Sequence, residues 1–211
     1  MPEPSESQVS ILGPLLEKAR GGDAAAREEL FAKCRNYVNL VARAQVESWM
    51  RTKVDASDLV QQTLLEAYRG FQQFQGKSEG EWLAWLRQIL SHNAQDFIRK
   101  LRTEKRGGAR EIPLQAGNDS EGFFHDPAAS EASPSELFVE REEEIALADA
   151  ITQLSPDHQE VIILRNLQRL PFEEVAQRMG RSRSAAQMLW MRAIEKLEQL
   201  LAGGAGAARP E

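Results

Sequence analysis

The sequence has little of what a secreted, membrane-bound or disulfide-stabilised protein needs. Its one cysteine, Cys34, excludes an internal disulfide framework, suits a reducing cytosol and is expected to be packed and inert. No run of eighteen apolar residues could cross a membrane. The start, MPEPSESQ, lacks the basic and apolar segments of a signal peptide. We therefore expect a cytoplasmic protein without membrane insertion.

Motifs for catalysis and for cofactors are missing as well. The three histidines, His92, His125 and His158, do not have the paired spacing of metal ligands. No glycine-rich loop precedes a Lys-Ser or Lys-Thr pair, and no nucleophile motif occurs. The sequence therefore predicts no enzyme activity, no metal and no cofactor.

Charge of both signs is abundant, but the two signs are segregated. The formal net charge is -6, which is unusual for a DNA-binding protein, because Lys and Arg contacts to phosphate dominate DNA affinity. From Ala84 to Arg110, however, seven basic and two acidic residues sum to +5. From Glu111 to Glu144, ten acidic residues and one arginine sum to -9. The basic stretch keeps nucleic-acid binding open.

The apolar pattern predicts an all-α protein, because helical periodicity recurs along the chain and no strand alternation of any length appears. The segment 107–135 is rich in Gly, Ser, Pro, Asp and Glu, which predicts a flexible acidic linker. We expect two small helical domains, 1–106 and 136–202, and a disordered tail over 203–211. The predicted helices cover 9–20, 24–49, 54–71, 81–102, 136–154, 156–167, 172–179 and 183–201.

The stretch from Leu170 to Leu201 predicts a helix-turn-helix, with two helices hinged on Gly180. Ser182 is a good N-cap for the second helix, and small residues on both sides of the turn allow a close crossing. In this motif the second helix enters the DNA major groove. A plain three-helix bundle with a solvated face is the alternative. The residues expected to contact DNA from the second helix are Arg183, Ser184, Gln187, Met188, Met191 and Arg192.

Two further helices carry candidate binding faces. The predicted helix 81–102 interleaves arginine with small and amide side chains opposite its apolar stripe, which suits close approach to a nucleic-acid backbone, although a merely solvated face is the alternative. Its candidate DNA contacts are Arg87, Gln88, Ser91, Gln95 and Arg99. The predicted helix 54–71 places Leu65 on an otherwise polar face. That leucine is either an ordinary exposed residue or the centre of a docking patch for a partner helix.

Together these parts resemble the bacterial RNA polymerase sigma factors. The resemblance covers about Leu15 to Leu201 and rests on three segments and the acidic linker between the second and third. With only these two domains, the chain is similar to the extracytoplasmic-function (ECF) group. The segments are DASDLVQQTLLEAYRGFQQF, EWLAWLRQILSHNAQDFIRK and LSPDHQEVIILRNLQRLPFEEVAQRMGRSRSAAQMLWMRAIEKL.

The resemblance implies a partner and a role for each candidate face. The loop Phe74 to Gly80 and the helix with Arg87 to Arg99 would recognise and melt the minus-ten promoter element. The helix-turn-helix would recognise the minus-thirty-five element and contact the flap of the polymerase core, and an anti-sigma factor could be a further partner. The helix 54–71 would dock on the clamp coiled coil of the core, with Asp55, Asp58, Leu59, Gln61, Gln62 and Leu65 as contacts.

The second helix of the helix-turn-helix departs from the family pattern. Gln187, Leu189, Ile194 and Glu195 stand where Lys or Arg is common, so this helix should bind DNA weakly by itself. We also expect the acidic linker to compete with DNA phosphate for the basic helix. Two other classes stay open: a dimeric DNA-binding regulator, and a helical adaptor that binds no DNA and leaves the +5 stretch unexplained.

Overall fold

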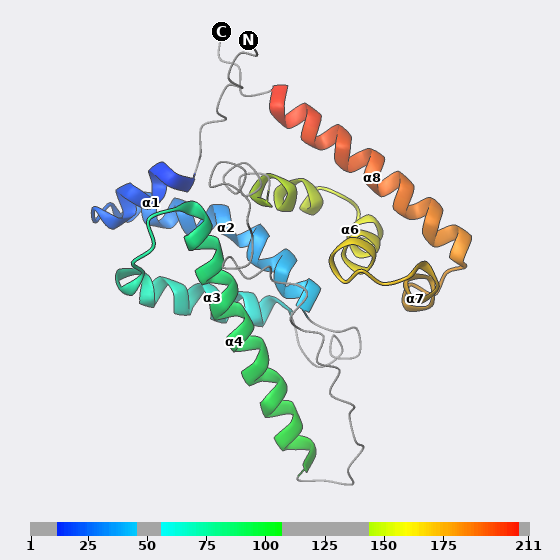
Figure 1. The fold of residues 1–211 in the computed structure, drawn as a ribbon, viewed down its shortest axis with the longest axis horizontal. Coiled ribbons are helices and arrows are strands. Elements are labelled where there is room, and N and C mark those ends of the chain that lie inside the picture. Colours follow the sequence, from blue (N-terminus) through cyan, green and yellow to red (C-terminus); the bar gives the residue numbers. More distant parts are fainter. Residues whose placement is uncertain (1–11, 46–55, 107–143, 207–211) are drawn as a thin grey trace, which may run out of the picture.

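The computed structural model describes residues 12–45, 56–106 and 144–206, with side chains up to 100 in the second range and up to 203 in the third. Every regular element in these ranges is a helix, which confirms the predicted all-α fold (Figure 1). The predicted linker 107–135, the predicted helical residues 9–11, 46–49 and 136–143, and the predicted docking residue Asp55 lie outside the described residues.

Two groups of helices follow one another along the chain. The first, here called the N-terminal unit, contains α1 (Leu12–Arg20), α2 (Ala24–Gln45), α3 (Ala56–Gly70), the 3-10 turn η1 (Phe71–Gln73) and α4 (Glu79–Arg106). The second, the C-terminal unit, begins with a helical stretch over 144–152. It continues with α6 (Pro156–Ile162), the π-helical turn η3 (Ile163–Leu167), α7 (Phe172–Arg178) and α8 (Arg183–Gly206).

The helices α4 and α8 have boundaries that differ from the prediction. The helix α4 starts at Glu79 rather than Glu81, because Ser78 and Glu81 form a capping box. The Glu81 backbone N–H donates to Ser78 Oγ at 3.2 Å, and Glu81 Oε2 accepts from the Ser78 backbone N–H at 2.9 Å. At the other end of the chain, α8 continues to Gly206, so residues 203–206, which we expected in the tail, are helical.

An aromatic core holds the N-terminal unit together. Trp82 is fully buried, and its ring lies edge-on to Phe31, Phe71 and Phe74 with ring centroids 5.3, 5.6 and 5.3 Å away. Its indole N–H donates to Cys34 Sγ at 3.2 Å. Burial raises the pKa of the Cys34 thiol to about 12, so the thiol stays protonated and has little of the reactive thiolate. The predicted packing of Cys34 is confirmed.

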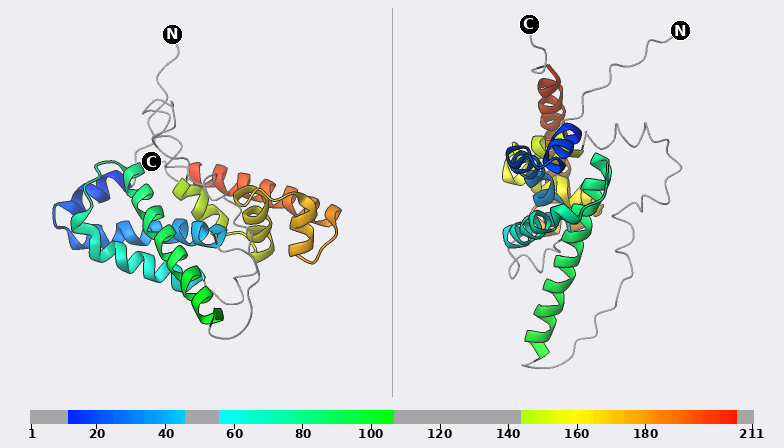
Figure 2. Two further views of the ribbon diagram at one scale, coloured as in Figure 1. Left: turned by 60° about the horizontal axis from the view of Figure 1, so that its bottom comes forward. Right: turned by 90° about the vertical axis from the view of Figure 1, so that its left-hand side faces the viewer.

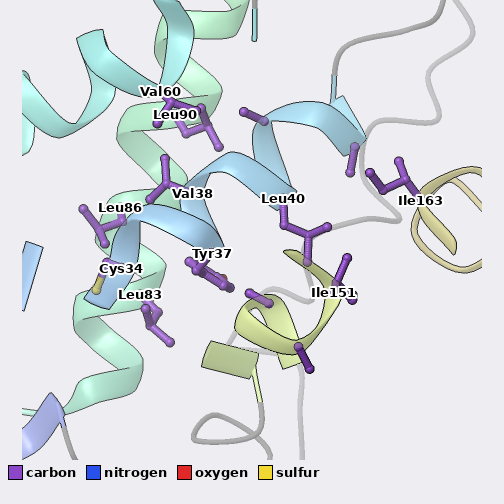
Figure 3. Packing of buried hydrophobic residues seen from close by; sticks show 14 of the residues in the cluster. Cys34, Tyr37, Val38, Leu40, Val60, Leu83, Leu86, Leu90, Ile151 and Ile163 are labelled. Carbon is purple, nitrogen blue, oxygen red and sulfur yellow. The ribbon is translucent and has the colours of Figure 1, made fainter. Parts of the chain in front are cut away.

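The long helices α2 and α4 form the frame on which the other elements are placed. Figure 3 shows Val38 of α2 directed toward α4, where Leu86 and Leu90 lie. The C-terminal end of α4 extends beyond the other helices of the N-terminal unit (Figure 2). In the C-terminal unit α6 and α7 pack against α8, and the end of α2 contacts η3. The two units therefore touch in this structure.

No helix in the ranges 12–45, 56–106 and 144–206 is long and apolar enough to cross a membrane. The same part of the chain contains no group of three or more His, Cys, Asp or Glu side chains that could hold a metal ion.

Candidate functional site

At the position of the predicted helix-turn-helix, the C-terminal unit has the two helices α7 and α8 joined by a short turn. Gly180 has a φ of +63°, a left-handed conformation that favours glycine, and it follows Met179, the C-cap of α7. Ser182 caps α8 by accepting from the Ala185 backbone N–H at 3.2 Å. Ala176 and Ala186 are 5% and 0% exposed, because their small side chains allow α7 and α8 to cross closely. The turn residues and the N-cap are as predicted.

One face of α8 stays open, opposite the face that packs on the domain core. The apolar side is anchored by Trp190, whose indole N–H donates to Asn166 Oδ1 at 2.9 Å. On the open side Met188 and Met191 are 49% and 57% exposed. Ser184 and Arg192 are exposed and Gln187 is half-buried. These residues share one face near the N-terminal end of the helix, as a major-groove reader requires.

Arg183 stands at the start of that open face and is paired within the domain. Its guanidinium lies 2.9 Å from Glu173 Oε1, and both side chains are more than 60% exposed. An exposed ion pair of this kind contributes little net free energy. The pair therefore does not prevent Arg183 from turning to a phosphate or a base.

The candidate docking face on α3 is broader than predicted. Leu65 is 49% exposed, and one helical turn further on Tyr68 is 37% exposed. The Tyr68 hydroxyl accepts from Arg27 at 2.7 Å, and the Arg27 guanidinium carbon lies 4.3 Å from the centre of the tyrosine ring. Asp58 and Gln61 are exposed beside this pair. The i, i+3 spacing from Leu65 could have identified Tyr68 in the sequence.

Two of the predicted docking residues are engaged inside the domain. Leu59 is 1% exposed and belongs to the core, so it supports α3 and offers no contact surface. Gln62 is exposed, but its amide donates to Asn93 Oδ1 on α4 at 3.1 Å. Asn93 in turn donates to Thr63 Oγ1 at 3.3 Å. This buried polar chain fixes α3 against α4 and explains why Asn93 lies within the apolar stripe.

The loop between η1 and α4 is held by several contacts. Phe74 is buried against Trp82 and Trp85. Arg20 donates to the Gly76 carbonyl at 2.6 Å. Glu81 Oε2 accepts from the backbone N–H groups of Lys77 and Ser78, and these bonds lower the pKa of its carboxyl group. The loop is therefore presented in a defined conformation.

The predicted DNA-contact residues of α4 differ in their exposure to solvent and in their ion-pair partners. Gln88 and Gln95 are exposed and Ser91 is half-buried. Arg99 is 77% exposed and lies 3.0 Å from Asp96 on the same helix. Arg87, in contrast, is only 21% exposed and lies 3.0 Å from Glu144 Oε2 of the C-terminal unit. This ion pair connects Arg87 to the other half of the chain.

Comparison with known proteins gives these faces a context. The family model of ECF sigma factors matches residues 9–203. The ECF RNA polymerase sigma factor BldN of Streptomyces coelicolor is 30% identical over 199 residues, which cover 93% of this chain and 68% of that protein. The RNA polymerase sigma factor CarQ of Myxococcus xanthus is 29% identical over 187 residues, which cover 88% of this chain and 95% of that protein.

Solved structures of similar proteins exist as well. The sigma factor RpoE from Bartonella quintana, in complex with the anti-sigma factor NepR, is 22% identical and the match covers 83% of this chain and 95% of that chain. Its TM-score of 0.30 is too low to place one helix upon another. The family match, in contrast, spans both the α3 face and the helix-turn-helix. The chain therefore belongs to the ECF sigma factor family.

Proposed function

We propose that this chain binds the core of RNA polymerase and directs it to promoters by recognising a minus-ten and a minus-thirty-five element. The observation that carries the proposal is the exposed pair Leu65 and Tyr68 on α3, in a chain whose helices α7 and α8 lie where the helix-turn-helix is predicted. A regulator that binds DNA alone has no need of an apolar docking face on a separate helical unit. A sigma factor needs both surfaces.

The α3 face is suited to a helical partner. Leu65 and Tyr68 provide the apolar centre, and Asp58 and Gln61 provide polar groups on the same side of the helix. Interfaces of this kind derive most of their affinity from a few central aromatic or aliphatic side chains surrounded by polar ones. We infer that this face docks on the clamp coiled coil of the polymerase.

The downstream promoter element is assigned to the loop 74–80 and the exposed side of α4. The loop is held at both ends by Phe74 and the Glu81 cap, so its polar groups are presented in one arrangement. Next to it, Gln88, Gln95 and Arg99 are exposed along α4. Amide and guanidinium groups suit both the phosphate backbone and the edges of unpaired bases.

The upstream element is assigned to α8. Gln187 and Arg183 lie on its first turns, where base contacts of a recognition helix concentrate. Met188 and Met191 add apolar surface for thymine methyl groups. Because few basic residues surround this face, we expect its affinity for DNA to be low until core polymerase holds the protein at the promoter. The same unit is assigned the contact to the polymerase flap.

The decisive experiment tests core binding and promoter selection together. Leu65→Asp should weaken association with purified core polymerase by at least about 2 kcal/mol, the loss typical of a central anchor residue. Ala32→Asp is the matched control, because it places the same charge at an exposed position of α2 in the same unit. Circular dichroism should show both variants to be as helical as the wild type.

Two results would refute the proposal. The first is that Leu65→Asp binds core polymerase as tightly as the wild-type protein and the control Ala32→Asp do. The second is a wild-type protein that binds a palindromic DNA site tightly without polymerase, as a dimeric regulator would. In a reconstituted reaction with core, the wild-type protein should start transcripts from a promoter library at one shared sequence.

Regulation and location follow from the same proposal. We expect the protein to act in the cytoplasm, where the polymerase works, and the polymerase supplies the catalytic site. The sigma factor RpoE of Bartonella quintana is bound to an anti-sigma factor in its solved structure. We expect this chain to accept a partner of that kind, in competition with core polymerase.

A further inference from the structure

The turn that leads into α7 contains a strained arginine. Arg169 follows Gln168, the C-cap of η3, and has a φ of 54°. It is the only residue other than glycine with a positive φ in the part of the chain that the structure describes. The Cβ atom of an L residue is crowded in this left-handed conformation, so the position after a helix end is often glycine. The backbone of this turn favours glycine, yet the sequence has arginine.

The conformation of this turn is held by backbone bonds that do not involve the arginine side chain. The Gln168 backbone N–H donates to the Ile163 carbonyl at 2.8 Å, and the Leu170 backbone N–H donates to the Leu164 carbonyl at 3.1 Å. A glycine at position 169 could make the same turn with less strain. The turn itself therefore gives no reason for an arginine at this position.

The Arg169 side chain is exposed and has no hydrogen-bond or ion-pair partner among the described residues. The other arginines around α7 and the start of α8 are all engaged: Arg165 with the Leu170 carbonyl, Arg178 with Glu174, Arg181 with Asp157 and Arg183 with Glu173. A residue held in a strained conformation without a structural partner points to a functional contact. Arg169 is the cation of this group that can bind a ligand without giving up an internal contact.

The turn lies beside the open face of α8. Figure 1 shows α7 next to the N-terminal end of α8. Glu173 in the first turn of α7 lies 2.9 Å from Arg183, the first residue of α8. On the same flank the Phe172 ring lies edge-on to Trp190 with the ring centroids 5.7 Å apart. Arg169 comes just before this segment in the chain, so it lies at the edge of the face assigned to the upstream element.

The docking geometry of a helix-turn-helix gives this position a ligand. The second helix enters the major groove, and the first helix crosses the sugar-phosphate backbone. An exposed cation directly before the first helix then lies close to a backbone phosphate. We propose that Arg169 binds a DNA phosphate beside the upstream element, and that its strained backbone is retained because the side chain makes this contact. This inference rests on the proposed function of α8.

The contact positions α8 on DNA without reading the sequence. Phosphate contacts fix the register and orientation of a recognition helix, whereas base contacts decide its preference. Arg183 can bind a phosphate only by leaving Glu173, so part of its gain is offset. Arg169 has no such partner to leave among the described residues. On a unit whose recognition helix has few basic residues, this one guanidinium carries a large share of the affinity for the backbone.

The test measures how promoter affinity depends on salt. The full-length protein is assembled with core polymerase, and closed complexes are formed at low temperature on a promoter that the wild-type holoenzyme selects from the library. Each phosphate contact contributes about 0.9 to the slope of log affinity against log salt concentration. Arg169→Gly should therefore bind more weakly than the wild type at about 50 mM salt. The ratio of the two affinities should shrink about three- to fourfold by about 200 mM salt.

Further variants separate the charge from the backbone conformation. Arg169→Asn, which also tolerates the left-handed conformation, should lose the same salt-dependent affinity as Arg169→Gly. Arg169→Lys keeps the charge and should keep most of the wild-type slope. Arg35→Gln removes an exposed arginine from α2 and should leave the slope unchanged. Arg169→Gly should unfold at a higher urea concentration than the wild type, so its weaker DNA binding would not arise from misfolding.

Two control measurements identify the kind of contact. Arg169→Gly should lose the same factor of affinity on a fragment with one changed upstream base pair, because a phosphate contact does not depend on sequence. Its affinity for core polymerase should equal that of the wild type. Lower affinity for core with an unchanged salt slope would overturn the proposal and assign Arg169 to a protein contact.

The outcomes separate this inference from the proposed function. Equal salt slopes of the wild type and Arg169→Gly would overturn the phosphate contact, even if core binding and promoter selection are normal. A wild-type holoenzyme that prefers no sequence would refute the proposed function. The slopes on the same fragment would then still decide the contact: a smaller slope in Arg169→Gly and Arg169→Asn retains it, and equal slopes overturn it.

Discussion

Replacing Gly76 by alanine tests whether the loop between η1 and α4 is as tightly built as its contacts indicate. A Cβ atom at this position would lie 2.3 Å from Phe74 Cζ, 2.6 Å from Phe74 Cε2 and 2.9 Å from Glu81 Cβ. The Phe74 ring cannot turn away freely, because it is buried with its centre 5.3 Å from that of Trp82 and 5.1 Å from that of Trp85. The backbone is also held, since Arg20 donates to the Gly76 carbonyl at 2.6 Å.

The expected loss follows from overpacking. Forcing a methyl group into a packed site usually costs about 1–3 kcal/mol. For a protein of this length, that loss lowers the melting temperature by roughly 2 to 12 °C. The substitution should also weaken opening of the downstream promoter element, because the loop assigned to that element is displaced. Binding to the upstream element alone should not change.

The assay is urea unfolding followed by tryptophan fluorescence, with Gly70→Ala as the matched control. A Cβ atom at Gly70 would meet Trp85 Cζ2 at 3.5 Å, an ordinary contact distance. Gly70→Ala should therefore change the unfolding free energy by no more than about 0.5 kcal/mol, or raise it slightly through the unfolded state. If Gly76→Ala is no less stable than Gly70→Ala, the loop is not packed as described.

Three further predictions concern backbone strain, acid stability and base recognition. Arg169 has a φ of 54°, so Arg169→Gly should raise the unfolding free energy by about 0.5–1 kcal/mol. Gly180 has a φ of +63°, so Gly180→Ala should lower the unfolding free energy by about 1 kcal/mol. Equal effects of the two substitutions in urea unfolding would contradict this. The lowered pKa of Glu81 means that its carboxylate stabilises the fold fully above the ordinary pKa, and that this contribution is lost as the pH falls through the lowered pKa. In Glu81→Gln the unfolding free energy should therefore fall less steeply with decreasing pH in the acidic range. An unaltered acid limb would show that the cap contributes nothing. Gln187→Ala should relax preference at one upstream base pair by about 1–3 kcal/mol, whereas Arg99→Ala should weaken downstream opening; identical promoter defects would refute the assignment of the two elements.

The local elements of this fold could be predicted from the sequence. The cap at Ser182 and the left-handed turn at Gly180 each depend on residues within one helical turn. The buried face of α8 follows from a repeat of apolar residues along a single helix. Such features are decided by neighbours a few positions away, and the sequence lists those neighbours directly.

The roles of several residues depended on partners far along the chain. The helical periodicity already placed Leu65 on a polar face, but Leu59, which the resemblance listed as a docking contact, proves to be in the core once α3 is packed. Arg87 has the chemistry of a DNA contact, yet here it is bound to Glu144, 57 positions away.

The contact between the N-terminal unit and the C-terminal unit was decided only by the tertiary structure. The apolar run Val161 to Leu164 can be seen in the sequence, but the sequence does not show which helices cover it. Helices of the same unit and α2 both contact this segment, and two of the contacts with α2 join Arg43 to Gln159 and Gln168 to Ala44 across 116 and 124 positions. A periodic pattern specifies which face of a helix is apolar. The partner for that face depends on how the whole chain packs, because contacts between distant residues form only when the intervening helices bring them together.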